Sequence, residues 1–206
     1  MEPKGKKDCE LVIYGNAPIL LSAPHCVNQK REGSIKLREY NTGAIAEYLA
    51  QAVGCSVITK RSYNEEAFND DANTDDESCE YKQKIMKYME DHKIILFVDI
   101  HGLDKKKDSI IDIGLDGGKN ACGKNYPYYL QRMIDRRFPE GKATIDEYYK
   151  ASGPNILSKW MSNKYSVCSV QLEINGSYRW FEAQYDPQSI RLLNTLLEWL
   201  NKCLDE

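Results

Sequence analysis

The sequence predicts an α/β fold, with a largely parallel central sheet covered by helices on both faces. Short apolar runs rich in β-branched residues alternate along the chain with longer amphipathic segments, and this alternation is typical of parallel sheets. The length of 206 residues favours one domain over two small ones. No internal repeat, low-complexity tract or linker divides the sequence, so residues 1–206 are expected to form a single domain.

Strands are predicted where short apolar runs lie between turn-forming residues. These segments are 9–15, 18–23, 55–60, 94–100, 109–115 and 166–174. The glycine-rich segment 114–120, GLDGGKN, matches neither a phosphate-binding loop nor a dinucleotide-binding motif. We therefore expect it to form a turn after a strand.

Helices are predicted where apolar residues recur at helical spacing. These segments are 41–53, 79–91, 126–138, 155–164 and 187–204. The last one begins with Asp186 as a good N-cap and Pro187 at the first helical position. Its expected core-facing stripe is formed by Ile190, Leu193, Leu197 and Leu200.

The segment 61–78, RSYNEEAFNDDANTDDES, is polar and acidic. It is expected to be a long loop on the surface. Such a loop is either a solvated surface segment or a place for binding groups, and the sequence leaves both readings open.

Composition excludes several classes of function. The net charge is −3 and no basic cluster stands out, so no nucleic-acid partner is expected. No apolar run approaches the roughly 20 residues that span a bilayer, so no membrane partner is expected. The N-terminal residues lack the apolar region of a secretory signal. The seven cysteines are odd in number and show no C-x-x-C spacing, which indicates reduced thiols in a cytoplasmic protein.

Three predicted strands lead into side chains that can bind metal or move protons. His25 follows PILLSAP, His101 follows IILFVDI, and Glu173 lies near the end of SVCSVQLEI. Ligands of open α/β sheets sit beyond the carboxyl ends of the strands. If these strands are parallel neighbours, the three side chains therefore share one crevice.

Two histidines and a carboxylate, with a water molecule, are the usual ligands of a catalytic zinc. Zinc lowers the pKa of its water and polarises a carbonyl, and a further carboxylate then serves as general base and acid. Asp99 lies two residues before His101 and faces the same side of a strand. It is expected to orient a histidine.

Other readings of these residues remain open. A single histidine at a strand end is commonly structural, and His92, at a predicted helix end, is read as a surface residue. Cys26 adjoins His25 and could act as a nucleophile, although adjacent residues of an extended chain point apart. A metal-independent hydrolase using Cys26 and a binding protein without catalysis are therefore the alternatives to a metalloenzyme.

Several motifs together resemble the N-formylglutamate amidohydrolase-like family, which is related to zinc carboxypeptidases and aspartoacylases. They are SAPHCVNQKREGSIKLREYNTGAIAEYLA, FVDIHG, IIDIGLDGG and SVQLEING, in the expected order between about residues 18 and 180. The resemblance implies a three-layer α/β domain of the zinc-carboxypeptidase type with a mostly parallel sheet. It also implies one zinc ion and hydrolysis of an amide or peptide-like bond in a small, carboxylate-bearing molecule or short peptide.

By the same resemblance, His25 and His101 occupy ligand positions of the zinc, and Glu173 is the general base. Carboxypeptidases carry a second ligand, a glutamate, three residues after the first histidine, where this chain has Asn28. Glu39, just before a predicted helix, fits the position used by relatives closer to the formylglutamate group. Glu32 is the alternative.

Arginines near the motifs are candidates for contact with the substrate, since a guanidinium binds carboxylates through two hydrogen bonds. Arg31 and Arg61 are assigned to substrate binding and Arg179 to stabilising the oxyanion, with a plain surface charge as the alternative for each. Formylglutamate deformylases carry Asp-x-Asn-Arg, and here Thr74 replaces that arginine. This departure speaks against N-formylglutamate itself as the substrate.

Overall fold

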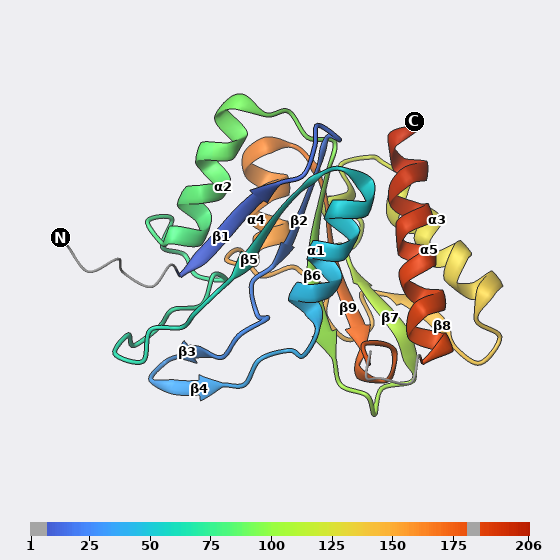
Figure 1. Cartoon of the computed structure of the whole chain (residues 1–206), viewed down its shortest axis with the longest axis horizontal. Helices are drawn as coiled ribbons and strands as arrows, with labels where there is room; N and C mark the ends of the chain where they lie inside the picture. Colours follow the sequence, from blue (N-terminus) through green and yellow to red (C-terminus); the bar gives the residue numbers. More distant parts are fainter. Residues whose placement is uncertain (1–7, 181–185) are drawn as a thin grey trace.

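The computed structural model describes residues 8–180 and 186–206 (Figure 1). Within this part of the chain the strands form a seven-stranded sheet and a separate two-stranded hairpin. In spatial order the sheet contains β1 (Cys9–Ile13), β5 (Ser56–Lys60), β2 (Ile19–Ala23), β6 (Leu96–Leu103), β9 (Cys168–Asn175), β7 (Ser109–Gly114) and β8 (Lys142–Ile145). The hairpin consists of β3 (Gln29–Arg31) and β4 (Ser34–Lys36).

The sheet is mixed, with a parallel centre. Strands β5, β2, β6 and β9 run parallel, whereas β1 pairs antiparallel with β5 and β7 pairs antiparallel with β9. The central strands are buried along their whole length, because helices cover both faces.

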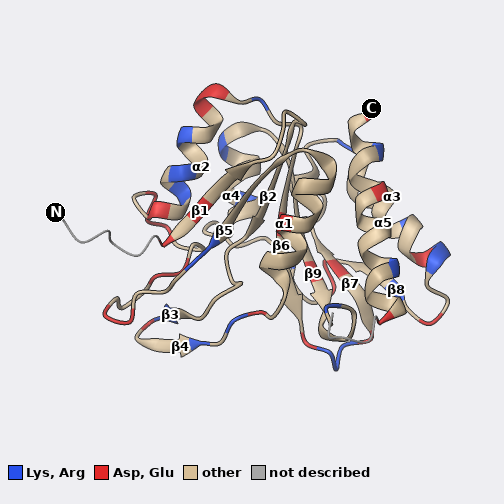
Figure 2. Cartoon of the chain, in the orientation of Figure 1, with Lys and Arg blue, Asp and Glu red and all other residues tan. Residues whose placement is uncertain are grey.

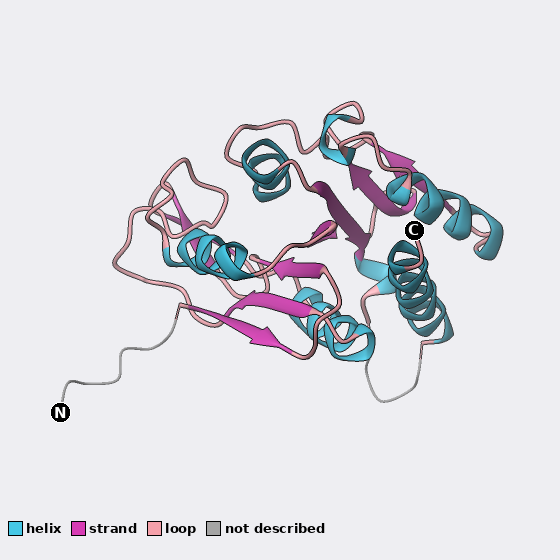
Figure 3. Cartoon of the chain, turned by 90° about the horizontal axis from the view of Figure 1, so that it is seen from above, coloured by secondary structure: helices cyan, strands magenta, loops and turns pink. Residues whose placement is uncertain are grey.

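The helices form two outer layers around the sheet (Figures 1 and 3). One layer contains α1 (Thr42–Val53), α3 (Tyr126–Arg137) and α5 (Pro187–Leu204), whose buried side chains join one core cluster with the sheet. The other contains α2 (Glu80–Asp91) and α4 (Leu157–Tyr165), which pack on the opposite face. The predicted three-layer α/β architecture is therefore confirmed. No helix among the described residues is long and apolar enough to cross a membrane.

The order of the strands creates a crevice beside β2. After β2 the chain crosses through α1 to β5 on one side, and it later returns through α2 to β6 on the other side. A reversal of this kind separates the connections at the carboxyl ends of the two strands, which is where open α/β sheets bind ligands. The carboxyl ends of β2, β6 and β9 lie along the lower edge of the sheet in Figure 1.

The six predicted strands and five predicted helices are all present, with ends that differ by a few residues. The hairpin β3–β4 and the edge strand β8 were missed because each has only three or four residues, too few to show a distinctive apolar pattern. Segment 114–120 follows β7 as a turn and a short 3₁₀ segment, as expected.

The prediction for the last helix was partly wrong. Asp186 caps α5 as expected, since its side chain accepts hydrogen bonds from the backbone of Gln188 and Ser189. The stripe assigned to the core lies at the edge of the buried face, however, and only Leu200 of its four residues is fully buried. The centre of that face is formed by Leu192, Leu196, Trp199 and Cys203. α5 is thus rotated so that Trp199 and a different set of leucines face the core.

Candidate metal centre

His25, Glu39 and His101 converge at the crevice. One potential ligand atom from each lies within 4.8 Å of the other two. His25 lies in the turn after β2, His101 lies in β6, and Glu39 lies between β4 and α1. Both histidines are only 2% exposed. Glu32 is exposed and lies outside this cluster, so the geometry favours Glu39 over Glu32 as the third member.

The backbone fixes the position of Glu39. Its N–H donates to the carbonyl of His25 at 2.9 Å, and its carbonyl accepts from the Thr42 hydroxyl at 2.8 Å at the start of α1. The N–H of Gly102 donates to Glu39 Oε2 at 2.9 Å. The carboxylate is therefore held between the two histidine-bearing segments.

Both histidines point the same ring nitrogen at Glu39. The distance to a carboxylate oxygen is 3.2 Å for Nδ1 of His25 and 3.4 Å for Nδ1 of His101. Each Nε2 instead meets a separate aspartate at 2.9 Å, Asp71 for His25 and Asp99 for His101. An imidazole whose far nitrogen is held by a carboxylate is the usual arrangement of a metal-binding histidine. The two Nδ1 atoms and the Glu39 carboxylate thus fit a divalent metal in chemistry and orientation.

Electrostatics favour a cation at this position. Burial raises the pKa of Glu39, but His101 and His25 lower it more, and the net pKa lies well below the usual range. Burial lowers the pKa of His101, but Asp99 and Glu39 raise it well above its usual range. A positive charge between these groups is therefore favoured, and a metal ion would supply it.

Glu173 lies next to this cluster on the neighbouring strand. It pairs in register with His101, and each is the third residue from the end of an eight-residue strand. Strands β6 and β9 extend past their predicted ends at residues 100 and 174, and both side chains lie within their strands. Burial and the charge of Glu39 raise the pKa of Glu173, although His101 and a hydrogen bond from Gln171 lower it. A carboxylate with a raised pKa suits a general base.

Asp71 is the residue at this centre that the sequence did not identify. It holds Nε2 of His25 and also forms an ion pair with Arg31. Burial raises its pKa, but His25 and Arg31 outweigh burial, so the pKa lies below the usual range. The Asp71–Thr74 motif drew attention to this segment, yet only the folding of the 61–78 loop toward β2 shows which histidine Asp71 meets.

The three arginines occupy different surroundings. Arg31 lies beside the cluster of His25, Glu39 and His101, called here the metal cluster. It forms an ion pair with Asp71, and its Nη2 lies 3.0 Å from Nε2 of His25. Arg61 is not brought to the crevice, because it forms ion pairs with Glu10 and Glu47 at 3.1 and 2.7 Å.

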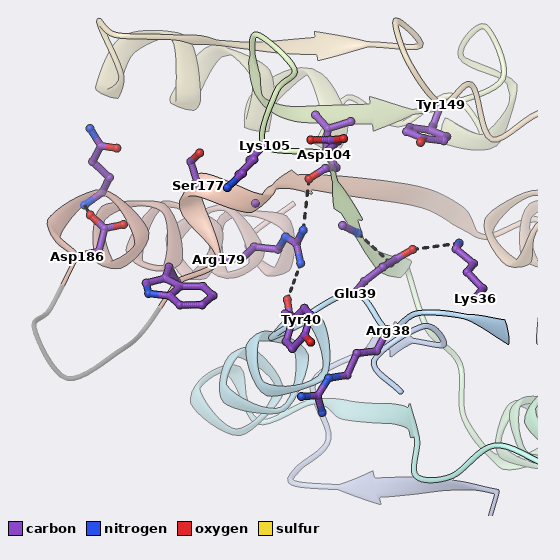
Figure 4. A pocket seen from close by; sticks show the side chains of 15 residues that line it. Lys36, Arg38, Glu39, Tyr40, Asp104, Lys105, Tyr149, Ser177, Arg179 and Asp186 are labelled. Atoms are coloured by element: carbon purple, nitrogen blue, oxygen red, sulfur yellow. Dashed lines mark hydrogen bonds and ion pairs between the residues drawn. The ribbon is translucent and has the colours of Figure 1, made fainter. Parts of the chain in front are cut away.

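Arg179 is buried beside the crevice and contacts three backbone carbonyls rather than a carboxylate. Its guanidinium donates to the carbonyls of Ile174 and Leu103 and to that of Tyr40 (Figure 4). A Cβ on Gly102 would lie 2.7 Å from this guanidinium, so a larger residue there would displace Arg179 from its position. Arg179 therefore joins β6, β9 and the segment before α1 around the site.

Cys26 is poorly suited to be a nucleophile. Its thiol donates to the carbonyl of Lys60 at 3.1 Å, on the side away from the metal cluster. Burial raises the pKa of Cys26 to about 11, so the thiolate is scarce near neutral pH. His92 is half-buried against Tyr88 and lies outside the cluster.

Two adjoining cavities surround the site. A cavity of about 470 Å³ contains the metal cluster, Glu173 and Asp71. A second, of about 790 Å³, begins at Glu39 and extends past Arg179 (Figure 4). Both are lined by Lys36, Glu39, Gly102 and Tyr149. A ligand that spans the two would pass directly over Glu39.

No family model matches the sequence, and no curated protein matches it. Solved structures with the same fold include a bacteriophage poly-gamma-glutamate hydrolase, with TM-score 0.62, 13% identity and coverage of 99% of this chain and 93% of that chain. An N-formylglutamate amidohydrolase from Ralstonia eutropha has TM-score 0.62, 8% identity and coverage of 96% and 97%. A metallo-carboxypeptidase from Pseudomonas aeruginosa has TM-score 0.52, 12% identity and coverage of 93% and 57%. The fold expected from the motifs, a carboxypeptidase-like α/β domain, is therefore confirmed.

Proposed function

We propose that the chain is a zinc-dependent hydrolase that cleaves an amide or peptide-like bond in a small, carboxylate-bearing substrate. One observation carries the proposal: His25, Glu39 and His101 converge beside a buried Glu173 at the crevice of the sheet. The similar structures that are hydrolases of amide bonds support it as well. The Cys26 alternative is disfavoured by the high pKa of that thiol.

In this proposal His25, Glu39 and His101 hold the ion, and Asp71 and Asp99 fix the orientation of the two imidazoles. When bound, zinc lowers the pKa of a water molecule and polarises a carbonyl. Zinc is the default choice for this ligand set, although manganese, cobalt or nickel would accept the same residues.

Glu173 acts first as the general base and then as the general acid. Its carboxylate accepts a proton from the water that attacks the substrate carbonyl, and it then donates that proton to the leaving nitrogen as the C–N bond breaks. The products are a carboxylate and an amine. The hydrogen bond from Gln171 Nε2 to Glu173 Oε1, at 2.7 Å, holds the side chain in one orientation for both transfers.

Arg179 lies in the adjoining cavity with three carbonyls as partners. A guanidinium has five N–H donors, so one hydrogen on each terminal nitrogen stays available. We retain Arg179 as the candidate for stabilising the oxyanion, with a second role in holding the walls of the cavity together.

The metal content tests the proposal first. We expect about one zinc ion per chain in the purified protein, measured by elemental analysis, and loss of that zinc in His101→Ala. His92→Ala is the matched control, since His92 stacks on Tyr88 away from the site. Absence of metal in the parent protein, even after incubation with zinc, would contradict the proposal.

Turnover is tested with N-acyl amino acids and γ-linked peptides. We expect hydrolysis by the parent protein and none by Glu173→Gln, which should keep its zinc because Glu173 is not among the three ligands. Full activity of Glu173→Gln would remove Glu173 from the mechanism. A zinc-loaded protein that binds these compounds but cleaves none would instead be a binding protein that retains the fold.

A further inference from the structure

The cations that remain free near the site are not the arginines singled out by the sequence. Arg31 is paired with Asp71, Arg61 with Glu10 and Glu47, and Arg179 donates to three carbonyls. Arg31 and Arg61 would have to give up these ion pairs to bind a substrate carboxylate, and Arg179 is already assigned to the oxyanion.

Among the described residues, two cations without a carboxylate contact, Arg38 and Lys105, lie instead along the 790 Å³ cavity, together with Lys36, which contacts Glu39. Lys36, Arg38 and Lys105 line it (Figure 4) and are called here the basic wall. Lys36 is the last residue of β4, Arg38 lies between β4 and α1, and Lys105 comes from the turn between β6 and β7. Figure 2 shows basic residues on both of these segments, at the edge of the sheet where the site lies.

The basic wall has few acidic partners. Among the described residues, Arg38 packs over the ring of Tyr40 at 4.5 Å, and no carboxylate contact is found for Arg38 or Lys105. Within the described part of the chain, the carboxylate that Lys36 contacts is that of Glu39, at 3.3 Å, and both cavities share these two residues.

The other carboxylates of this cavity are already engaged in local structure. Asp104 accepts a hydrogen bond from the backbone of Lys106 at 2.9 Å. Asp186 caps α5 through Gln188 and Ser189. These hydrogen bonds do not cancel the charges of the two aspartates. Among the residues that line the cavity, Lys36, Arg38, Lys105 and Arg179 stand against Glu39, Asp104 and Asp186, an excess of one positive charge.

We propose that the basic wall binds the carboxylates of a short acidic peptide whose scissile amide lies beside His101 and Glu173. A volume of about 790 Å³ is within the roughly 300–1,000 Å³ typical of sites for drug-sized ligands, so it holds more than a single amino acid. Lys36 stands at the junction of the two cavities and would meet the carboxylate nearest the scissile bond. The position of that bond rests on the proposed function, whereas the binding of the acidic chain does not.

The test measures binding without turnover. Zinc-loaded Glu173→Gln protein is titrated by calorimetry with γ-linked triglutamate and with the same chain carrying amides in place of its α-carboxylates. We expect the acidic probe to bind more tightly. Charge reversal by Arg38→Glu or Lys105→Glu should weaken its binding by about five- to tenfold at low ionic strength, with little effect on the amide probe.

Lys106→Glu is the matched control, because it makes the same change of charge at an exposed neighbour that does not line the cavity. Its binding of the acidic probe should equal that of the parent protein. An equal loss of affinity for the acidic probe in Lys106→Glu and Lys105→Glu would contradict the proposed role of the basic wall. Equal affinity of the parent site for the two probes would contradict it as well. These outcomes concern binding alone, so they are distinct from a failure of the proposed hydrolysis, which would show as absent turnover in the parent protein.

Discussion

At the scale of single residues, the aspartates that contact the two histidines determine how the imidazole rings are oriented at the centre. Asp71 and Asp99 each hold an Nε2 atom at 2.9 Å and so direct both Nδ1 atoms toward Glu39. Without these carboxylates, an imidazole could rotate or carry its proton on the wrong nitrogen. The orientation of the two rings is thus set by residues that do not themselves touch the ion.

Replacement of Asp71 by Asn should weaken zinc binding by about 10- to 100-fold, because the amide holds His25 less firmly and leaves Arg31 without its carboxylate partner. Competition with a chelating dye measures the affinity. Asp75→Asn, an exposed change in the same loop, should bind zinc like the parent protein. Unchanged affinity in Asp71→Asn would show that the orientation of His25 does not depend on Asp71.

The pH dependence of turnover should report on Glu173. Burial raises its pKa above the ordinary value of 4.5, and the protonated form cannot accept a proton from water. The activity kcat/KM should therefore fall on the acid side at a higher pH than an ordinary glutamate would give. Gln171→Leu removes a hydrogen bond that lowers this pKa, so it should move the acid limb to still higher pH. An unmoved or lowered acid limb in that variant would contradict the assignment.

At the scale of elements, β7 positions the loop that closes the site. The buried carboxylate of Asp112 accepts hydrogen bonds from the Thr144 hydroxyl and from the backbone of residues 147, 148 and 149. Tyr149, which lines both cavities, is at the end of this series. One buried side chain in a strand thus fixes a loop over the crevice.

Asp112→Ala should reduce the free energy of unfolding by about 2–4 kcal/mol, since it leaves several buried donors without a partner. Denaturation in urea measures the loss. The exposed Asp108→Ala, at the start of the same strand, should change stability by less than about 0.5 kcal/mol. A loss below about 1 kcal/mol in Asp112→Ala would mean that the loop is held by other contacts.

At the scale of the whole molecule, the metal cluster joins three segments that are far apart in the sequence. His25, Glu39 and His101 come from the turn after β2, the segment before α1 and strand β6. Because the unfolded chain does not bring these ligands together, zinc binding should stabilise the folded state.

Free zinc at about 100 times its Kd should stabilise the fold by about 2.7 kcal/mol. Thermal unfolding with and without a chelator measures this as a shift in Tm. The shift should disappear in His101→Ala and persist in His92→Ala. An identical chelator effect in the two variants would locate the metal elsewhere in the protein.

The sequence by itself determined the alternation of strands and helices, because hydrophobic spacing and helix caps are local signals. It also pointed to His25, His101 and Glu173, since each lies at or near the end of a strongly apolar strand. The short strands of the hairpin and β8 could not be predicted, because three or four residues are too few to show a distinctive period.

Only the tertiary structure determined which charged side chains contact one another. Arg61 lies in a motif-rich region but pairs with Glu10 and Glu47, whereas Asp71, in a polar loop, reaches His25. The choice of Glu39 over Glu32 and the free charge of Lys105 depend in the same way on how loops fold over the end of the sheet. Contacts between residues distant in sequence depend on the order of the strands and the path of the loops. Neither can be predicted from the local pattern of residues.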